Sequence, residues 1–119
     1  MTEDEVQRAG LDYLQYLMNQ GKLWFTRLNS GEAFVKKGGK YYKISLCPPG
    51  TADAIVIRPV ECQCNGMICD RINVLFPEFK SKTGKQSPAQ KAFQAMVEAQ
   101  GYRYVIIRSV EKLMELVPQ

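Results

Sequence analysis

Three residues have the types and positions needed to bind a divalent cation beside a phosphate: Asp53, Glu78 and Lys80. The apolar run "VLFPEF" ends near Glu78, and Lys80 follows two residues later, so their side chains share one strand face. Asp53 opens a second apolar run, "DAIVI". Mg²⁺ in proteins is typically held by one or two carboxylates together with waters and phosphate oxygens. The pattern therefore predicts a cation site into which a lysine reaches.

The absence of histidine narrows the alternatives. None of the 119 residues is histidine, which excludes histidine metal sites, Ser-His-Asp and Cys-His nucleophile systems, and histidine general bases. Any chemistry must rest on carboxylate, lysine, cysteine or tyrosine side chains.

Capping and turn signals predict the elements that position these residues. Thr2 is an N-cap residue for a helix over residues 3–20, Asn65-Gly66 is a strong hairpin signal, and Ser87-Pro88 opens a second helix. The remaining expected elements are strands at 22–29, 53–64, 67–82 and 102–108, two short extended runs within 34–44 around Gly38-Gly39, and a last helix after Ser109. This order predicts one α/β sheet, mixed and flanked by helices.

The hairpin register predicts which residues meet. Counting outward from Asn65-Gly66 pairs Cys64 with Met67, Val56 with Leu75, Ala54 with Pro77, and Asp53 with Glu78. Two carboxylates about 5 Å apart repel by roughly 3 kcal/mol at an effective dielectric near 20, so a cation between them would be stabilising. The alternative is an ordinary strand-end charge cluster in which Lys80 neutralises the acids. A bulge at Pro59 or Pro77 would shift the count.

Composition bounds the class of protein. A chain of 119 residues with a formal net charge of +4 fits one domain, residues 1–119, with a modest basic excess. No apolar run approaches the ~18 residues of a membrane span. The acidic start "MTEDEVQRAG" lacks the order of a secretory signal, which favours the cytoplasm.

The motifs together resemble one nuclease family. "GTAD", a strand and then "PEFK" resemble the PD-(D/E)XK superfamily, and "EFKSKTGKQSPAQKAF" resembles its VRR-NUC branch. "TEDEVQ", "TRLNSG", "GGKYYK", "PPGTAD" and "YVIIRSVEKL" occur in the family's order over nearly the whole chain. Ala52 stands where the superfamily name calls for proline. The resemblance implies a restriction-endonuclease-like core.

The resemblance also implies metal-dependent hydrolysis of DNA phosphodiesters. Asp53, Glu78 and the Phe79 carbonyl would bind Mg²⁺ or Mn²⁺, while Lys80 would position or deprotonate the attacking water. Stand-alone members of this size resemble phage-type enzymes that act as homodimers on four-way (Holliday) junctions. Nucleases acting on flaps, nicks or linear DNA, and noncatalytic DNA-binding or thiol-metal modules that retain the fold, are the alternatives.

Family members use a glutamate of the first helix near the metal, and both Glu3 and Glu5 are candidates. Helical spacing puts Glu3 and Gln7 on the side that borders the core, which favours Glu3 as ligand and Gln7 as a phosphate contact. Helix-start glutamates also act simply as dipole partners.

Gln90 has two competing interpretations. It stands three residues after Ser87, so Ser-x-x-Gln forms a capping box in any protein. The family's glutamine at this position faces the catalytic lysine and the substrate phosphate. One side chain is not expected to serve both roles.

Basic and aromatic residues suggest a DNA-contacting surface. Arg27 and Asn29 share a strand face, and the 34–44 segment adds lysines, including Lys40, with Tyr41 and Tyr42. Such residues can track a phosphate backbone and stack on bases, although a basic hairpin can equally be merely solvated. Lys82 and Lys85, in the turn after the E-x-K block, complete the expected DNA contacts.

Three cysteines surround the predicted Asn65-Gly66 turn. The register places Cys62 opposite Cys69, with Cys64 on the same face, and Cys47 could add a fourth ligand. Structural zinc sites usually use Cys-x2-4-Cys pairs, and Cys62 and Cys64 are separated by one residue. Free or oxidation-sensitive thiols are therefore favoured over zinc.

Overall fold

The computed structural model describes the backbone of residues 1–64 and 67–119 and the side chains outside 60–72. Its elements, in chain order, are α1 (Glu3–Asn19), β1 (Trp24–Arg27), β2 (Glu32–Lys37), β3 (Lys40–Ser45), β4 (Ala54–Cys64), β5 (Met67–Phe79), α2 (Pro88–Ala99), β6 (Arg103–Ile107) and α3 (Val110–Leu116). The predicted order of helices and strands is confirmed. The differences are at the ends: β1 begins later than expected, and β5 ends at Phe79.

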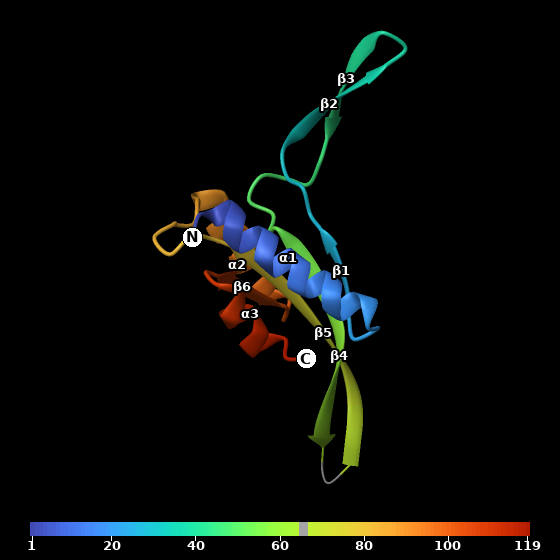
Figure 1. The fold of residues 1–119 in the computed structure, drawn as a ribbon, viewed down its shortest axis with the longest axis vertical. Coiled ribbons are helices and arrows are strands. Elements are labelled where there is room, and N and C mark those ends of the chain that lie inside the picture. The colour runs from blue at the N-terminus through green and yellow to red at the C-terminus, as the bar shows by residue number, and fades with distance from the viewer. Residues whose placement is uncertain (65–66) are drawn as a thin grey trace.

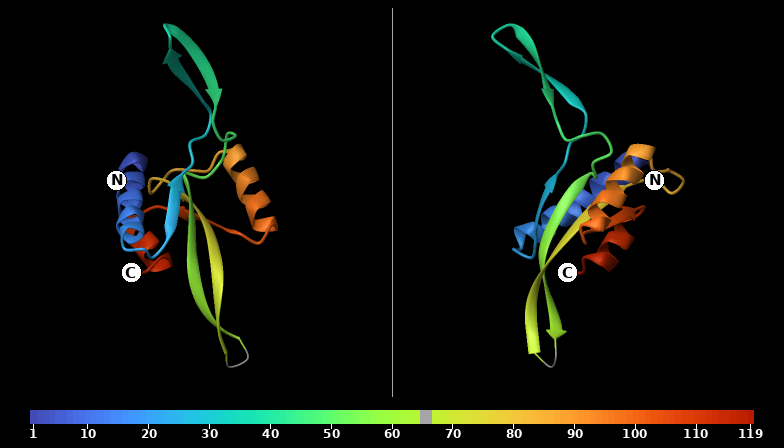
Figure 2. Two further views of the ribbon diagram at one scale, coloured as in Figure 1. Left: turned by 90° about the vertical axis from the view of Figure 1, so that its right-hand side faces the viewer. Right: turned by 180° about the vertical axis from the view of Figure 1, so that it is seen from behind.

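The central sheet is mixed, as predicted. Its strand order is β1-β4-β5-β6, with β1, β4 and β5 antiparallel and β6 parallel to β5. The parallel step is made by the β5-α2-β6 crossover, in which the helix returns the chain to the starting end of the sheet. Helices lie on both faces of this sheet (Figures 1 and 2).

The expectation that all strands join one sheet is wrong. β2 and β3 pair only with each other, as a separate two-stranded sheet, within the part of the chain that the structure describes. Figure 1 shows this hairpin projecting from the body at one end, while β4 and β5 run on past the sheet at the other. The molecule is accordingly elongated, with principal extents of 62 × 35 × 30 Å. Segment 32–45 is called the arm below.

The register predicted from the turn is confirmed over most of the hairpin. The β4-β5 ladder runs from Cys64 with Met67 to Val56 with Leu75. It does not continue to the predicted pairs further on, because Pro77 has no backbone N–H to donate to a ladder. Instead the Asp53 side chain takes over, and its Oδ2 accepts a hydrogen bond of 2.6 Å from the Phe79 backbone N–H.

The core lies on both faces of the sheet. On one face, α1 and α3 bury Val6, Leu14, Leu17 and Leu113 against Val56, Leu75, Phe79 and Ile107 of the strands. On the other face, a smaller cluster joins Val97 of α2 to Ala52 and Tyr104, with Phe76 and Phe93 packed against it edge to face. The predicted covering of both faces of β4 and β5 is thus confirmed for their described side chains.

Gly10 sets how closely α1 approaches the sheet. A Cβ atom placed on Gly10 would lie 2.3 Å from the ring of Phe79, much closer than real carbon contacts. Gly10 sits in the middle of a helix, where glycine costs about 1 kcal/mol relative to alanine. The cost is offset because only glycine allows α1 to pack onto the end of β5, next to Glu78 and Lys80.

Two hydrogen bonds, one buried and one partly buried, hold the C-terminal residues against the sheet face that α1 covers. The Tyr13 hydroxyl donates to the Val117 carbonyl at 2.5 Å, and Arg58 Nη2 donates to the Leu116 carbonyl at 2.8 Å. Burial raises the pKa of Tyr13, so the hydroxyl remains a donor. These contacts hold α3 on the same face of the sheet as α1.

The structure tests the cysteine and membrane predictions only in part. The backbone register pairs Cys62 with Cys69, as counted, but the thiols of Cys62, Cys64 and Cys69 lie outside the described side chains. Cys47, half-buried, is a free thiol. Among the helices that the structure describes, none is long and apolar enough to cross a bilayer.

Candidate active site

The end of β5 meets the start of β4 and the first turns of α1 and α2 at one edge of the sheet. This edge holds Asp53, Glu78, Lys80 and Gln90, and Glu3 reaches it from α1. The helix positions follow from their caps: Thr2 caps α1 and Ser87 caps α2, each in a full capping box. Local capping therefore fixes the residues at which the two helices begin, and both helix starts lie beside the strand ends.

Asp53 and Glu78 are neighbours, although not as a ladder pair. The Asp53 carboxylate is tied to the backbone N–H of Phe79, the residue that follows Glu78. This contact holds the two carboxylates side by side, close enough for the charge of Asp53 to raise the pKa of Glu78. The two acids therefore do converge, through a side-chain bond where the strand ladder has ended.

Glu78 is buried in a way that disfavours its ionised form. Its exposed fraction is 1%, and burial, together with the neighbouring Asp53 carboxylate, raises its pKa from 4.5 to about 8, against the opposing effect of Lys80. Its Oε1 accepts a hydrogen bond from Gln90, while its Oε2 is buried with no hydrogen-bond partner. Since buried polar atoms are nearly always partnered, this oxygen calls for a proton shared with Asp53 or for a cation.

Lys80 is buried beside the two acids but pairs with a third. It is 8% exposed, and its Nζ lies 3.4 Å from Glu3 Oε1. Glu5, the other candidate of the first helix, is used in the capping box, where its Oε2 accepts from the Thr2 backbone N–H at 3.0 Å. The structure thus brings Glu3 to the site and directs Glu5 to the helix end.

Gln90 forms the predicted capping box and also contacts one of the two acids. Its Oε1 accepts the Ser87 backbone N–H at 2.8 Å and completes the capping box, while its Nε2 donates to Glu78 Oε1. One side chain makes both contacts because an amide has separate acceptor and donor ends; the expected position facing Lys80 and a substrate phosphate stays a prediction. The cap orients the side chain, and the free NH₂ group then faces the buried carboxylate.

Several oxygen atoms of the kind that bind hard cations gather at the end of β5. The N–H and C=O of a strand residue point to the same side, so the Phe79 carbonyl projects toward Asp53, as its N–H does. Among the described residues, no cluster of three histidine, cysteine or acidic side chains forms a metal site. Two carboxylates and a carbonyl, with one buried oxygen lacking a partner, still form a donor set that suits a hard divalent cation.

Residues that sequence reasoning missed support the turn after β5. Arg108 Nη1 donates to the carbonyls of Ser81, at 2.6 Å, and Gly84, at 2.8 Å. This clamp fixes the turn that carries the exposed Lys82 and Lys85. No local motif marks Arg108, because its partners lie more than twenty residues away along the chain.

Tyr104 and Gln86 were also missed. Gln86 Nε2 donates to the Tyr104 hydroxyl at 3.2 Å and to Gln94 Oε1 at 2.9 Å. Burial, opposed by Gln86 and reinforced by the Glu78 and Asp53 charges, raises the pKa of Tyr104 to about 12. The hydroxyl of Tyr104 is therefore neutral. Its ring belongs to the core cluster with Phe76 and Phe93, so its residue type alone does not mark it as a site residue.

The predicted DNA contacts lie in separate parts of the molecule. Gln7 and Arg27 line one hollow of about 310 Å³, together with Asp4, Arg8, Leu11 and Asp12. Asn29 is exposed two residues after the end of β1. Lys40 lies at the tip of the arm, which Figure 1 shows projecting away from the sheet, so it is not brought to the site.

No protein-family model matches this chain, and no curated protein and no solved structure matches it at a significant level. Its function is therefore inferred from the residues and the geometry described above.

Proposed function

We propose that this protein is an endonuclease that hydrolyses DNA phosphodiester bonds with a bound Mg²⁺ or Mn²⁺, on a PD-(D/E)XK core of VRR-NUC type. The observation that best supports the proposal is Glu78, a carboxylate buried beside Asp53 with one oxygen left without a partner. A carboxylate in that position is expensive in the free protein. A divalent cation would remove the cost, because it supplies the missing partner and compensates the repulsion between the acids.

The ion pairing of Lys80 argues against a simple charge cluster. In such a cluster Lys80 would neutralise Asp53 and Glu78, but its ion pair is with Glu3. Three carboxylates against one ammonium leave a formal charge of −2 at the site when all four groups are ionised. A doubly charged cation would balance that charge, whereas the described side chains alone do not.

Each residue can then be given a role. Asp53, Glu78 and the Phe79 carbonyl would hold the cation, which supplies a more acidic bound water and polarisation of a phosphate oxygen. Lys80 orients the attacking water and stabilises negative charge that develops on the phosphate, and Glu3 keeps its ammonium in place. Gln90 donates to Oε1 of Glu78, which leaves Oε2 of Glu78 available to the cation.

The substrate proposed is DNA, in branched form such as a four-way junction, bound through Gln7, Arg27, Asn29, Lys82 and Lys85. Cutting such a junction symmetrically takes two active sites, so two copies of the chain would act together. The cytoplasm of a bacterial or phage-infected cell is the proposed setting.

A cleavage assay tests the proposal directly. Purified protein is incubated with linear, flap and four-way DNA in Mg²⁺, Mn²⁺ or chelator, beside Lys80→Ala and Asp53→Asn. Each substitution should reduce cleavage at least about 100-fold, since each removes electrostatic stabilisation of the reaction. Exposed Lys91→Ala and Glu98→Gln on α2 are the matched controls and should retain full activity. Cleavage that survives both site substitutions excludes this site, and DNA binding without cleavage in either metal favours a noncatalytic module.

A further inference from the structure

The arm exposes more apolar surface than an isolated hairpin can sustain. Phe34 and Tyr41 are 70% and 71% exposed, and Val35, Tyr42 and Ile44 are between 41% and 51% exposed. Both strands of the arm pair only with each other among the described residues. A lone two-stranded hairpin is marginally stable in water, and contiguous exposed apolar surface usually marks an interaction site.

The two faces of the arm differ in chemistry. Directly paired residues of antiparallel strands share a face. Ala33 with Ile44 and Val35 with Tyr42 therefore form one face, which is apolar up to the lysines at the tip. Phe34 with Lys43 and Lys36 with Tyr41 form the opposite face, where Lys36 lies 5.7 Å from the Tyr41 ring centre. The first is called the aliphatic face and the second the basic face.

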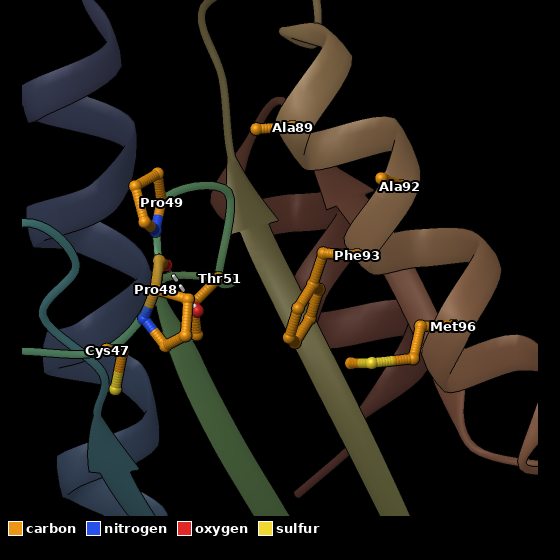
Figure 3. A pocket seen from close by; sticks show the side chains of 8 residues that line it. All are labelled: Cys47, Pro48, Pro49, Thr51, Ala89, Ala92, Phe93 and Met96. Atoms are coloured by element: carbon orange, nitrogen blue, oxygen red, sulfur yellow. Dashed lines mark hydrogen bonds between the residues drawn. The ribbon is translucent and has the colours of Figure 1, made fainter.

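An apolar groove begins where the arm joins the body. Figure 3 shows its two walls: Cys47, Pro48, Pro49 and Thr51 of the loop after β3, and Ala89, Ala92, Phe93 and Met96 along one side of α2. The volume between them is about 520 Å³. A second hollow of about 460 Å³ shares Cys47, Pro48 and Pro49 and reaches Gly31 and Glu32 at the base of the arm. The groove thus continues from the arm's base to α2.

The arm does not cover this groove in its own chain. The Gly31 N–H donates to the Cys47 carbonyl, the Leu46 N–H to the Gly31 carbonyl, and the Cys47 N–H to the Asn29 carbonyl, at 2.8 to 3.0 Å. These bonds fix the base of the arm so that it points away from the body in all three views of Figures 1 and 2. The aliphatic face and the groove are therefore both open.

We propose that the aliphatic face of the arm packs into the apolar groove of a second copy of this chain, and that the second arm does the same in return. The inference rests on the pairing of two copies in the proposed function but not on nuclease chemistry. One chain carries both surfaces side by side, so a two-fold axis near the arm's base satisfies both contacts at once. A phosphate backbone is the poorer occupant of the aliphatic face, because none of Ala33, Val35, Tyr42 and Ile44 is charged and only Tyr42 can stack on bases.

The dimensions suit a weak, reversible dimer. Strands of six residues are about 20 Å long and α2, with twelve, is about 18 Å long, so face and groove match in length. A contact of this length and about 10 Å width covers about 200 Å² on each surface. Two reciprocal contacts comprise four such surfaces, or about 800 Å², which is in the size range of weak, transient interfaces. The basic faces would stay open for DNA beside the partner's α2.

The test is the oligomeric state of the full chain, measured by sedimentation velocity without DNA or divalent cation. The wild-type protein should sediment as a dimer of the 13.5 kDa chain at about 10 to 100 µM. Val35→Lys with Ile44→Glu, which keeps the net charge, should raise the dimer dissociation constant on the order of 100-fold. Met96→Lys in the groove should do the same, and it keeps the test valid if the arm variant misfolds.

The matched control is Phe34→Lys with Tyr41→Glu, on the basic face. These two residues are the more exposed pair, yet the control should leave the dimer intact. A wild-type monomer over the whole range, a control that dissociates as the aliphatic-face variant does, or variants on both surfaces that stay dimeric would each overturn the inference.

Cross-linking identifies the occupant. In a Cys62→Ser, Cys64→Ser, Cys69→Ser background, Val35→Cys should be joined to the native Cys47 by a short bismaleimide mostly between chains. Links mostly within one chain would mean that the arm folds back, which overturns the inference. A dimer that does not cleave DNA would refute only the proposed nuclease function. A monomer that cleaves DNA would refute only the proposed dimer.

Discussion

Glu78→Gln should stabilise the cation-free protein while abolishing cleavage. In the wild-type protein the pKa of Glu78 is about 8, raised by burial from the 4.5 of a free carboxyl. Because the pKa is raised on folding, the folded state keeps a proton that the unfolded chain releases. Stability is therefore full below about pH 4.5 and is lost as the pH rises toward 8.

The size of the effect follows from the two pKa values. At pH 8 the loss is about 4 kcal/mol if the full shift applies, and this is an upper figure for a partly hydrated site. The introduced amide would not titrate, would keep an Oε1 acceptor for Gln90, and would present an NH₂ group to Asp53. The variant should thus unfold roughly 10 °C above the wild-type protein at pH 8 and at nearly the same temperature at pH 5.

The divalent cation should reverse the difference. A cation replaces the proton between the acids, so Mn²⁺ or Mg²⁺ should raise the wild-type midpoint more at pH 8 than at pH 6, where protons compete for Glu78. Glu78→Gln should show little or no such rise, because it loses one of the two carboxylates.

The assay is thermal unfolding followed by circular dichroism from pH 5 to 8, in chelator and in each cation. Glu98→Gln, an exposed acid on α2, is the control and should follow the wild-type curve. The reasoning is refuted if the difference between Glu78→Gln and the wild-type protein does not change with pH, or if the variant is the less stable protein at pH 8.

Four further substitutions separate the site from its supports, with a fifth as a compensating change. Ser87→Ala and Gln90→Ala should each lower the unfolding free energy by about 1 kcal/mol, measured with denaturant, because each removes a capping bond. Only Gln90→Ala should also slow cleavage, by at least about 10-fold, because it loses the bond to Glu78. Equal cleavage by the two variants would contradict the second role of Gln90. Gly10→Ala should destabilise the protein by about 1 to 3 kcal/mol despite its better helix propensity, because the added Cβ meets the Phe79 ring, and Phe79→Leu in the same chain should lessen that loss. Tyr13→Phe should lower the unfolding free energy by about 1 kcal/mol and leave cleavage unchanged, since its bond to Val117 is far from the acids; a matching fall in activity would argue otherwise.

Much of the site was readable because it depends on neighbours in the sequence. The Ser87 and Thr2 capping boxes are four-residue patterns, and the β4-β5 register follows from counting outward from a turn. Asp53, Glu78 and Lys80 were found by that count even though the ladder stops before reaching them. The outcome held because the Asp53 carboxylate replaces the missing strand bonds at Pro77.

The sequence did not show how deeply each site side chain is buried away from water. The partner of Lys80 depends on where the first turn of α1 lands, and that position depends on Gly10 meeting Phe79 across the sheet. The clamp of Arg108 on the turn after β5 joins residues more than twenty apart. Such contacts have no local signature, because they arise when the elements pack together.

The amino-acid sequence by itself determined the order of the elements, their caps, the hairpin register and the three residue types proposed to hold a cation. Only the tertiary structure decided that the arm leaves the sheet, that Glu3 and not Glu5 reaches Lys80, and that Glu78 loses its water. The physical reason is one of range. Helix, cap and turn preferences are set by residues a few positions apart, whereas burial, and the pKa that follows from it, is set by every element that closes over a side chain.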